Sequence, residues 1–391
     1  MFSKPTTRRK AFRFAIAGSA LAFLVACNTG LSSGPRVNTS APVPVALLVP
    51  GGSVNAGDAL LAQSLENAAR LAMADLDGVT IDLRVYNTAG QAAQASAMAS
   101  QAIGDGAKII LGPVYAEAAN AAGLVAANRG VNVLSFSNNP AIAGGNVFVL
   151  GPTFRNSANR LVQHAMANGK ANILIAHGND GSETAGRDAI QDAIAANGAI
   201  LAGTTGFELT QTGVIDAVPQ IVADVRSSGA DAVFLTSGTS GALPFLAQLL
   251  PENGLDPTET QYIGLQRWDI PASAMSLPGL QGGWFARPDP ALATLFSDRY
   301  NSAFSSSPHP IAGLAYDGIA AIGALVSQGR GDALTVEALT QSAGFAGVNG
   351  VFRLLPDGTN ERGLTVSQIT DSQVSVIDPA PRSFGSAGFS A

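Results

Sequence analysis

From residue 43 onward, short apolar runs alternate with longer Ala-rich segments. The apolar runs, such as Val43 to Val49, have the length of buried strands. The segments between them repeat their apolar residues at helical spacing, as Leu61, Leu65 and Ala72 do within residues 58–76. A regular alternation of buried strands and helices is typical of βαβ units, in which helices cover a parallel sheet. The pattern therefore predicts an α/β fold.

The units form two successive series, separated by Gly151-Pro152. The first series has predicted strands at 43–49, 81–86, 108–111 and 132–136 and helices at 58–76, 91–103 and 116–128. The second has strands at 172–176, 200–207, 232–236 and 261–265 and helices at 154–167, 183–196, 214–227 and near 243–250. Helices at 290–304, 310–326 and 335–342 and strand-like runs at 350–355 and 364–369 follow. We therefore expect two doubly wound parallel-sheet lobes.

Composition agrees with this prediction and excludes several classes of protein. The chain has 391 residues, 47% of them hydrophobic and 13% charged, which favours packed cores over disorder and suggests two domains. A single Cys excludes a disulfide scaffold. Residues 1–26 hold five basic and no acidic residues, which leaves 17 basic and 28 acidic residues in the rest, a net charge of −11. So acidic a body argues against a nucleic-acid partner.

The N-terminus is typical of an export signal. Basic residues precede an apolar stretch at 14–26 that is too short to span a membrane. It ends in Leu24-Val25-Ala26-Cys27, which resembles the lipobox of bacterial lipoproteins, so we expect a signal peptide at 1–26 and an acylated Cys27. Arg8-Arg9 leaves general and twin-arginine export both open. Residues 27–42 would form a flexible tether, and Asn28 after the Cys favours the outer membrane.

In parallel sheets ligands bind beyond the carboxyl ends of the strands, so two such sheets facing each other would form a cleft. In the first series we expect hydroxyls, amides and one aromatic ring to contact a small polar ligand. These residues are Ser53, Asn55, Tyr115, Ser137 and Asn138. The alternative is that the same Ser and Asn side chains cap helices and form turns.

In the second series the candidate ligand-binding residues follow three strands. They are Asp180, Ser182, Ser237, Thr239, Gln266, Arg267 and Trp268. Arg267 is placed to clamp a carboxylate with two hydrogen bonds while Trp268 packs on the ligand. The competing interpretation is a surface ion pair between Arg267 and Asp269 with Trp268 buried.

Four motifs carry a resemblance to a known family. They are Val45-Ala46-Leu47-Leu48-Val49-Pro50, Ile110-Leu111-Gly112-Pro113, Val133-Leu134-Ser135 and Ala315-Tyr316-Asp317-Gly318. Together they are similar to type I periplasmic binding proteins of the leucine-binding (Leu/Ile/Val-type) group. The resemblance implies two lobes joined by three hinge crossings, near Gly151, Ala286 and Val351. Lobe 1 would comprise 43–150 and 287–350, lobe 2 would comprise 151–286 and 351–378, and 379–391 would be a tail.

One departure from that group concerns the ligand's ammonium. The group holds the ammonium with an acid on a loop of lobe 2, and the position that resembles it here is Gln266, which carries no charge. Asp180, Glu183 or Asp269 would have to substitute for that acid. A second departure is the small run Ser237-Gly238-Thr239, where the group has an aromatic residue. Leucine-like specificity therefore does not follow from the resemblance.

The leading functional prediction is a periplasmic, lipid-anchored solute-binding protein. It would capture a small polar ligand, such as an amino acid, and deliver it to an ABC permease. The alternative is a lipoprotein activator of penicillin-binding proteins, which would regulate peptidoglycan synthesis through protein–protein contacts. We expect no enzymatic activity, metal or other cofactor, because His164, His177 and His309 are scattered in sequence. Residues 238–242 resemble a nucleophile elbow only weakly, so a hydrolase built on Ser240 is the third hypothesis.

Overall fold

The computed structural model describes Met1 and residues 34–384. The predicted signal peptide, the acylated Cys27, part of the predicted tether and the end of the predicted tail lie outside these residues. Within the described part of the chain, no helix combines the length and apolar character needed to cross a bilayer.

Lobe 1 contains a five-stranded sheet in which every neighbouring pair of strands is parallel. The order is β2-β1-β3-β4-β5, with β1 at Val43–Val49, β2 at Ile81–Asn87, β3 at Ile109–Leu111, β4 at Asn132–Ser135 and β5 at Val147–Val149. Alternate residues of β1 face opposite sides, as a strand requires. Val45 and Leu47 pack with helices α1 (Ala56–Ala74) and α9 (Gly313–Val326), and Ala46 and Leu48 pack with α2 (Ala92–Gly104) and α3 (Ala116–Ala127).

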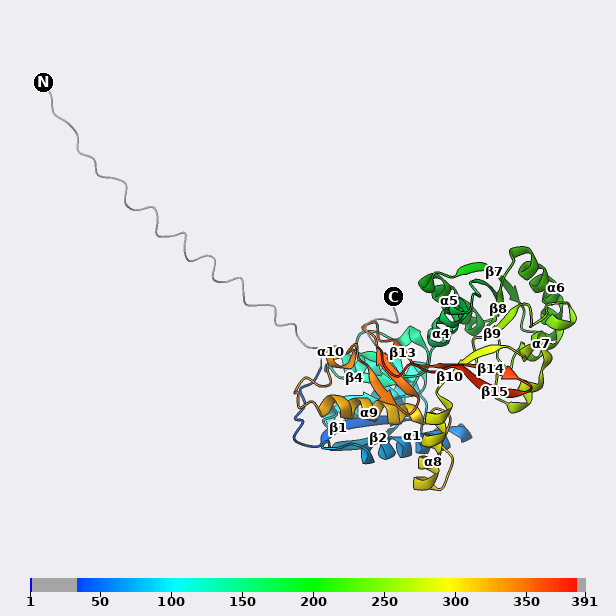
Figure 1. Ribbon diagram of the computed structural model, residues 1–391. Coiled ribbons are helices and arrows are strands. Elements are labelled where there is room, and N and C mark those ends of the chain that lie inside the picture. Colours follow the sequence, from blue (N-terminus) through cyan, green and yellow to red (C-terminus); the bar gives the residue numbers. More distant parts are fainter. Residues whose placement is uncertain (2–33, 385–391) are drawn as a thin grey trace.

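Lobe 2 contains a seven-stranded sheet with the order β15-β14-β10-β9-β8-β6-β7. Its parallel part comprises β6 (Asn172–Gly178), β7 (Ile200–Phe207), β8 (Ala232–Leu235), β9 (Gln261–Gly264) and β10 (Trp284–Arg287). Strands β14 (Thr365–Thr370) and β15 (Gln373–Asp378) extend it in antiparallel fashion. One face packs against α4 (Phe154–Ala167) and α5 (Gly181–Asn197), the other against α6 (Gln211–Ser228) and α7 (Leu243–Glu252). The predicted α/β fold with two lobes is confirmed (Figure 1).

Several smaller elements complete the fold. They are α8 (Pro290–Phe304), α10 (Val336–Leu339), an antiparallel sheet of β11 (Phe345–Gly347), β12 (Gly350–Leu354) and β13 (Asn360–Arg362), and 3₁₀ turns at Pro140–Ile142, Ala272–Ser276 and Pro278–Leu280. Phe352 and Leu354 of β12 lie in the core of lobe 1. The chain therefore enters lobe 2 for the last time between β13 and β14, near Gly363. The predicted third crossing near Val351 is wrong, because β12 and β13 still belong with lobe 1.

A buried ion pair lies where the chain passes between the lobes. Asp317 of α9 is fully buried, and its Oδ2 accepts a hydrogen bond of 3.1 Å from Nη1 of Arg362 on β13. The backbone N–H of Val348 and the side-chain amide of Asn349 donate to the same carboxylate at 2.8 and 3.1 Å. Burial raises the pKa of Asp317, and the Arg362 guanidinium and these donors offset part of that rise. The charged pair is thus stabilised by several donors at once.

The same arginine reaches the first crossing. Nε of Arg362 donates to the backbone carbonyl of Leu150 at 3.0 Å, one residue after β5 ends. Asn360 donates to the carbonyls of Val149 and Gly151 at 2.7 and 2.9 Å. These hydrogen bonds hold β13 against the end of β5, so the first and third crossings lie side by side.

Asp317→Ala should lower the unfolding free energy by about 3–5 kcal/mol, because it leaves the Arg362 charge buried without its partner. Urea denaturation followed by circular dichroism measures this as a lower midpoint. Asp332→Ala is the matched control, since it breaks the exposed pair Arg330–Asp332 and should leave the midpoint nearly unchanged. Equal midpoints for Asp317→Ala and the wild type would contradict the stabilising role of the pair.

Candidate functional site

The strand order of each lobe reverses at one place. In lobe 1 the chain moves from β1 to β2 on one side and then returns past β1 to β3 on the other; in lobe 2 it does the same at β6, β7 and β8. Such reversals open a crevice at the carboxyl ends of the two diverging strands, which is where open α/β sheets bind ligands. The carboxyl end of β5 leads into the first crossing and that of β10 into the second. Because parallel strands end at the same edge of a sheet, the carboxyl edges of both sheets face the crossings.

At the lobe 1 crevice, three predicted residues gather around a carboxylate that sequence reasoning did not select. Tyr115 donates its hydroxyl proton to Oδ1 of the buried Asp58 at 2.5 Å, and the Asn55 amide approaches Oδ2 at 3.4 Å. Burial alone would raise the pKa of Asp58, but interactions with Ser53, Tyr115 and Asn55 outweigh it and lower this pKa. The bond to Asp58 raises the pKa of Tyr115 to about 12, so the phenol stays a donor. Tyr115 remains 38% exposed and accessible to a ligand.

The loop after β4 places its two predicted residues differently. Ser137 is buried, and its hydroxyl oxygen accepts a hydrogen bond from the backbone N–H of Asn139 at 3.1 Å. That geometry corresponds to the turn-forming alternative for Ser137. Asn138 is exposed. Of the two, only Asn138 presents its side chain at the surface.

At the lobe 2 crevice a second buried carboxylate, Glu183, collects donors from two strand ends. Its Oε2 accepts hydrogen bonds from the backbone N–H of Gly178 at 3.2 Å, from the hydroxyl of Thr236, and from the hydroxyl of Ser237 at 2.9 Å. Ser237 is fully buried and so faces Glu183. Asp180 caps α5 by accepting from the backbone N–H of Glu183 at 2.7 Å.

Two further predicted residues of lobe 2 differ in what their side chains do. Ser182, in the first turn of α5, is exposed. Thr239 donates to the carbonyl of Ile270 at 2.6 Å. Thr239 therefore ties the loop after β8 to the loop after β9, whereas Ser182 lies at the surface next to Glu183.

The loop after β9 carries an ion-pair cluster. Arg267 forms two hydrogen bonds with Asp269, of 2.9 and 2.7 Å, and Nη1 of Arg287 donates to the same carboxylate at 2.9 Å. Burial would raise the pKa of Asp269, but the two guanidiniums hold it below its ordinary value. Arg267 keeps 42% of its side chain exposed. Gln266 instead donates to the carbonyl of Thr236 at 3.0 Å.

Trp268 does not line the crevice. Its side chain is fully buried in the core of lobe 2, with its ring 6.4 Å from that of Phe285. Gly264 and Gly283 make room for it, because a Cβ at either position would lie within 2.2 or 2.4 Å of the indole. The prediction that Trp268 packs on a ligand is therefore wrong for this conformation. The competing interpretation is correct in that Trp268 is buried and Arg267 pairs with Asp269, but the pair is only partly at the surface, because the Asp269 side chain is 8% exposed.

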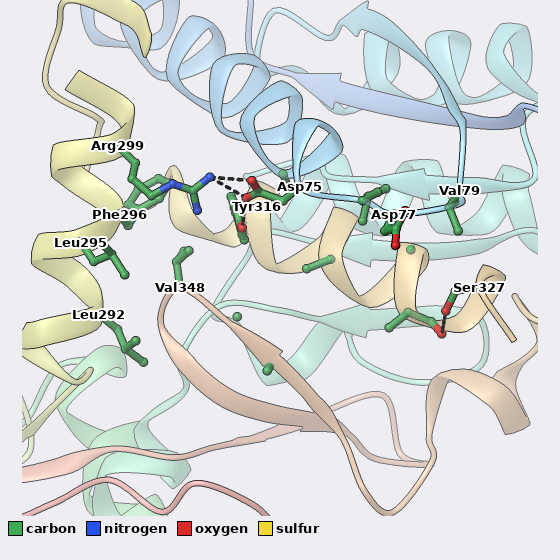
Figure 2. Close-up of a pocket in the computed structure, with 17 residues that line it drawn as sticks. Asp75, Asp77, Val79, Leu292, Leu295, Phe296, Arg299, Tyr316, Ser327 and Val348 are labelled. Carbon is green, nitrogen blue, oxygen red and sulfur yellow. Dashed lines mark hydrogen bonds and ion pairs between the residues drawn. The ribbon is translucent and has the colours of Figure 1, made fainter. Parts of the chain in front are cut away.

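A cavity of about 460 Å³ lies elsewhere, between α1, α8, α9 and β11 of lobe 1 (Figure 2). The polar groups of the cavity form hydrogen bonds with one another. Arg299 binds Asp75 at 2.6 and 2.8 Å, and the Tyr316 hydroxyl donates to the same carboxylate. It contains none of the predicted ligand-binding residues. Among residues 34–384, no three or more His, Cys, Asp or Glu side chains group together as metal ligands.

Replacing Trp268 distinguishes a core residue from a ligand-binding one. Trp268→Ala should lower the unfolding free energy by about 3–5 kcal/mol, because it leaves a large cavity beside Phe285. Thermal or urea unfolding measures the loss. A variant as stable as the wild type would contradict the core assignment.

The fold agrees with comparisons to known proteins. A Rhodospirillum rubrum protein assigned to branched-chain amino acid ABC transport is 18% identical, with a TM-score of 0.72 over 86% of this chain and 100% of its own. A Desulfitobacterium hafniense ABC transporter substrate-binding protein in complex with Leu is 17% identical, with a TM-score of 0.61 and coverages of 86% and 100%. A Rhodopseudomonas palustris solute-binding protein in complex with 3,4-dihydroxybenzoic acid is 16% identical, with a TM-score of 0.55 and coverages of 88% and 99%.

No curated protein matches the chain. The family model described as "Periplasmic binding protein" matches residues 42–373, which is most of the chain and includes both lobes and all three crossings. The predicted resemblance to type I periplasmic binding proteins is thereby confirmed, and the chain belongs to the periplasmic binding protein family.

Proposed function

We propose that this chain is a solute-binding lipoprotein of the periplasm that captures a small polar ligand between its lobes for ABC-type import. The observation that carries the proposal is the arrangement of the polar loops at the strand-order reversal of each sheet, where open α/β sheets form a ligand-binding crevice. Each crevice lies at the carboxyl edge of its sheet, which faces the hinge crossings, and is bordered by hydroxyl and amide side chains. Ligand bound to one lobe would be covered by the other on closure, so its affinity depends on contacts made in the closed state.

The Arg267 cluster supports a ligand that carries a carboxylate. Two guanidiniums, Arg267 and Arg287, share the single carboxylate of Asp269, so the cluster keeps one positive charge in excess. Arg267 is the more exposed of the two, at 42% against 14% for Arg287. A guanidinium can bind a carboxylate through two parallel hydrogen bonds. Leu and 3,4-dihydroxybenzoic acid, the ligands of two similar structures, both contain a carboxylate.

Isothermal titration of the purified protein with L-leucine, L-glutamate, succinate and 3,4-dihydroxybenzoate tests the proposal. At least one should bind, and Arg267→Ala should weaken that binding by roughly 10–100-fold, because one charge-assisted bidentate contact is lost. Arg187→Ala is the control, since Arg187 forms a comparable pair with the exposed Asp188 on α5. The absence of binding by the wild type to every compound would count against solute capture, and unchanged affinity in Arg267→Ala would count against a carboxylate contact.

The lipid anchor is a separate part of the proposal and depends on Cys27. Acylation at this residue would hold the protein at a membrane, with the outer membrane favoured by Asn28. Cys27→Ser should move the protein from the membrane fraction to the soluble periplasmic fraction, because the thiol that accepts the lipid is missing. Fractionation and immunoblotting measure this shift. Persistent membrane association of the variant would contradict anchoring through Cys27.

The alternative function is activation of a penicillin-binding protein by direct contact. Lobe 2 supplies the observation that favours it: Gln266 bonds to Thr236, Asp269 is already paired with two guanidiniums and Trp268 is buried. This loop therefore offers neither an available acid for an ammonium nor an aromatic wall. Affinity purification of the tagged protein from solubilised membranes separates the two hypotheses. Recovery of an ABC permease supports import, and recovery of a penicillin-binding protein without a permease supports the alternative.

A further inference from the structure

The two buried carboxylates at the crevices occupy equivalent positions. Asp58 is the third residue of α1, the helix after the first strand of lobe 1, and Glu183 is the third residue of α5, the helix after the first strand of lobe 2. Each side chain is more than nine-tenths buried, with 5% and 8% exposed. Each helix N-terminus favours a negative charge. A buried carboxylate in the first turn of the helix that follows the first strand therefore occurs once in each lobe.

Each carboxylate joins the two loops that border its crevice. Asp58 accepts hydrogen bonds from Asn55, in the loop after β1, and from Tyr115, in the loop after β3. Glu183 accepts hydrogen bonds from Gly178, at the end of β6, and from Thr236 and Ser237, in the loop after β8. In both lobes these are the strands between which the order reverses. In lobe 2 a backbone hydrogen bond still joins Thr236 to the carbonyl of Ala176 on β6 at 3.2 Å, and the Glu183 side chain extends this connection to Ser237. In lobe 1 the Asp58 side chain connects the loops after β1 and β3.

A loop that is already ordered loses less conformational entropy when a ligand binds to it. Neutral hydroxyl donors held by a carboxylate also make shorter and stronger bonds than donors held by a neutral acceptor. Tyr115 stays 38% exposed while its hydroxyl is held, so the ring can contact a ligand in a fixed orientation. When the lobes close, the ordered loops of both lobes would present their side chains to the ligand in a single arrangement.

We infer that Asp58 and Glu183 are positioning residues of the interlobe site, which fix the crevice loops of lobe 1 and lobe 2 in the ligand-binding arrangement. The inference rests on the proposed solute-binding function. Neither residue needs to contact the ligand. The inference adds these two buried acids to the side chains that line the crevices in the proposed function.

Amide hydrogen exchange, measured without ligand, tests the ordering of the loops. Glu183→Ala should speed exchange at least several-fold in peptides covering 178–184 and 235–240, because three donors lose their acceptor. Glu183→Gln should retain part of the protection, since its amide oxygen can accept two of the three hydrogen bonds. Asp188→Ala, an exposed acid on the same helix, is the control and should leave exchange unchanged. In lobe 1, Tyr115→Phe removes one donor with little loss of packing and should speed exchange over 53–58.

Affinity for the compound that the wild type binds among L-leucine, L-glutamate, succinate and 3,4-dihydroxybenzoate is then measured on the same proteins. Glu183→Ala should raise its dissociation constant by on the order of tenfold, and Glu183→Gln should raise it less, because the neutral amide oxygen keeps part of the hydrogen bonding. Exchange that stays slow in both Glu183→Ala and Tyr115→Phe, or faster exchange with unchanged affinity, would overturn the inference while the proposed function stands. A wild-type protein that binds none of the four titrated compounds would overturn the proposed function, and the inference with it. Tyr115→Phe keeps the test decisive if Glu183→Ala does not fold.

Discussion

The buried pair of Asp317 and Arg362 determines how the two lobes are joined. An unpaired charge in this position would be strongly destabilising, so the arginine must stay where the aspartate holds it. From there it also donates to the carbonyl of Leu150 and lies over the ring of Phe352 at 5.0 Å. Helix α9, strand β13 and the end of β5 therefore meet at one point. Because β5 runs into the first crossing and β13 into the third, the pair fixes two of the three connections relative to the lobe 1 core.

Lobe 2 is connected to this point through neutral hydrogen bonds and one exposed ion pair, Arg155–Asp357 at 3.8 Å, which contributes little at the surface. Asn156, in the first turn of α4, donates to the carbonyl of Asn360 at 2.8 Å and accepts from the backbone N–H of Thr153 at 2.9 Å. Neutral bonds of this kind contribute less than the buried ion pair and can exchange partners at lower cost. A hinge motion that keeps the Asp317–Arg362 pair intact would therefore bend the chain on the lobe 2 side, beyond Gly151 and Gly363. The carboxyl edge of the lobe 2 sheet would move, and that of lobe 1 would stay with the pair.

The elements that were predictable from sequence are those with an apolar repeat. Strands such as β1 and β8 are continuous apolar runs, and α1 repeats its apolar residues every turn, so both lobes followed from pattern alone. Strand β13 escaped prediction because it has no apolar residue: Asn360 and Arg362 are buried by hydrogen bonding and charge pairing. The third crossing was misplaced for the same reason. Strands β5 and β11 were also not predicted, although β3, which has the same length of three residues, was predicted at 108–111.

The site was predictable at the level of loops and less so at the level of side chains. Strand ends indicated where polar residues gather, but which of them face outward depends on partners distant in sequence. Trp268 is buried because Gly264 and Gly283 leave space for its indole, and Ser237 faces inward because Glu183 lies behind it. In both cases the contacting residues lie on different helices, strands or loops. The spacing of apolar residues along the sequence does not reveal such contacts. The polar groups left at the surface, above all Arg267, Asn138 and Ser182, then define the chemistry that the crevices offer. The guanidinium in excess at the Arg267 cluster suits the carboxylate of a ligand, and the exposed Asp180 at the start of α5 would be the acid of the lobe 2 crevice that faces an ammonium.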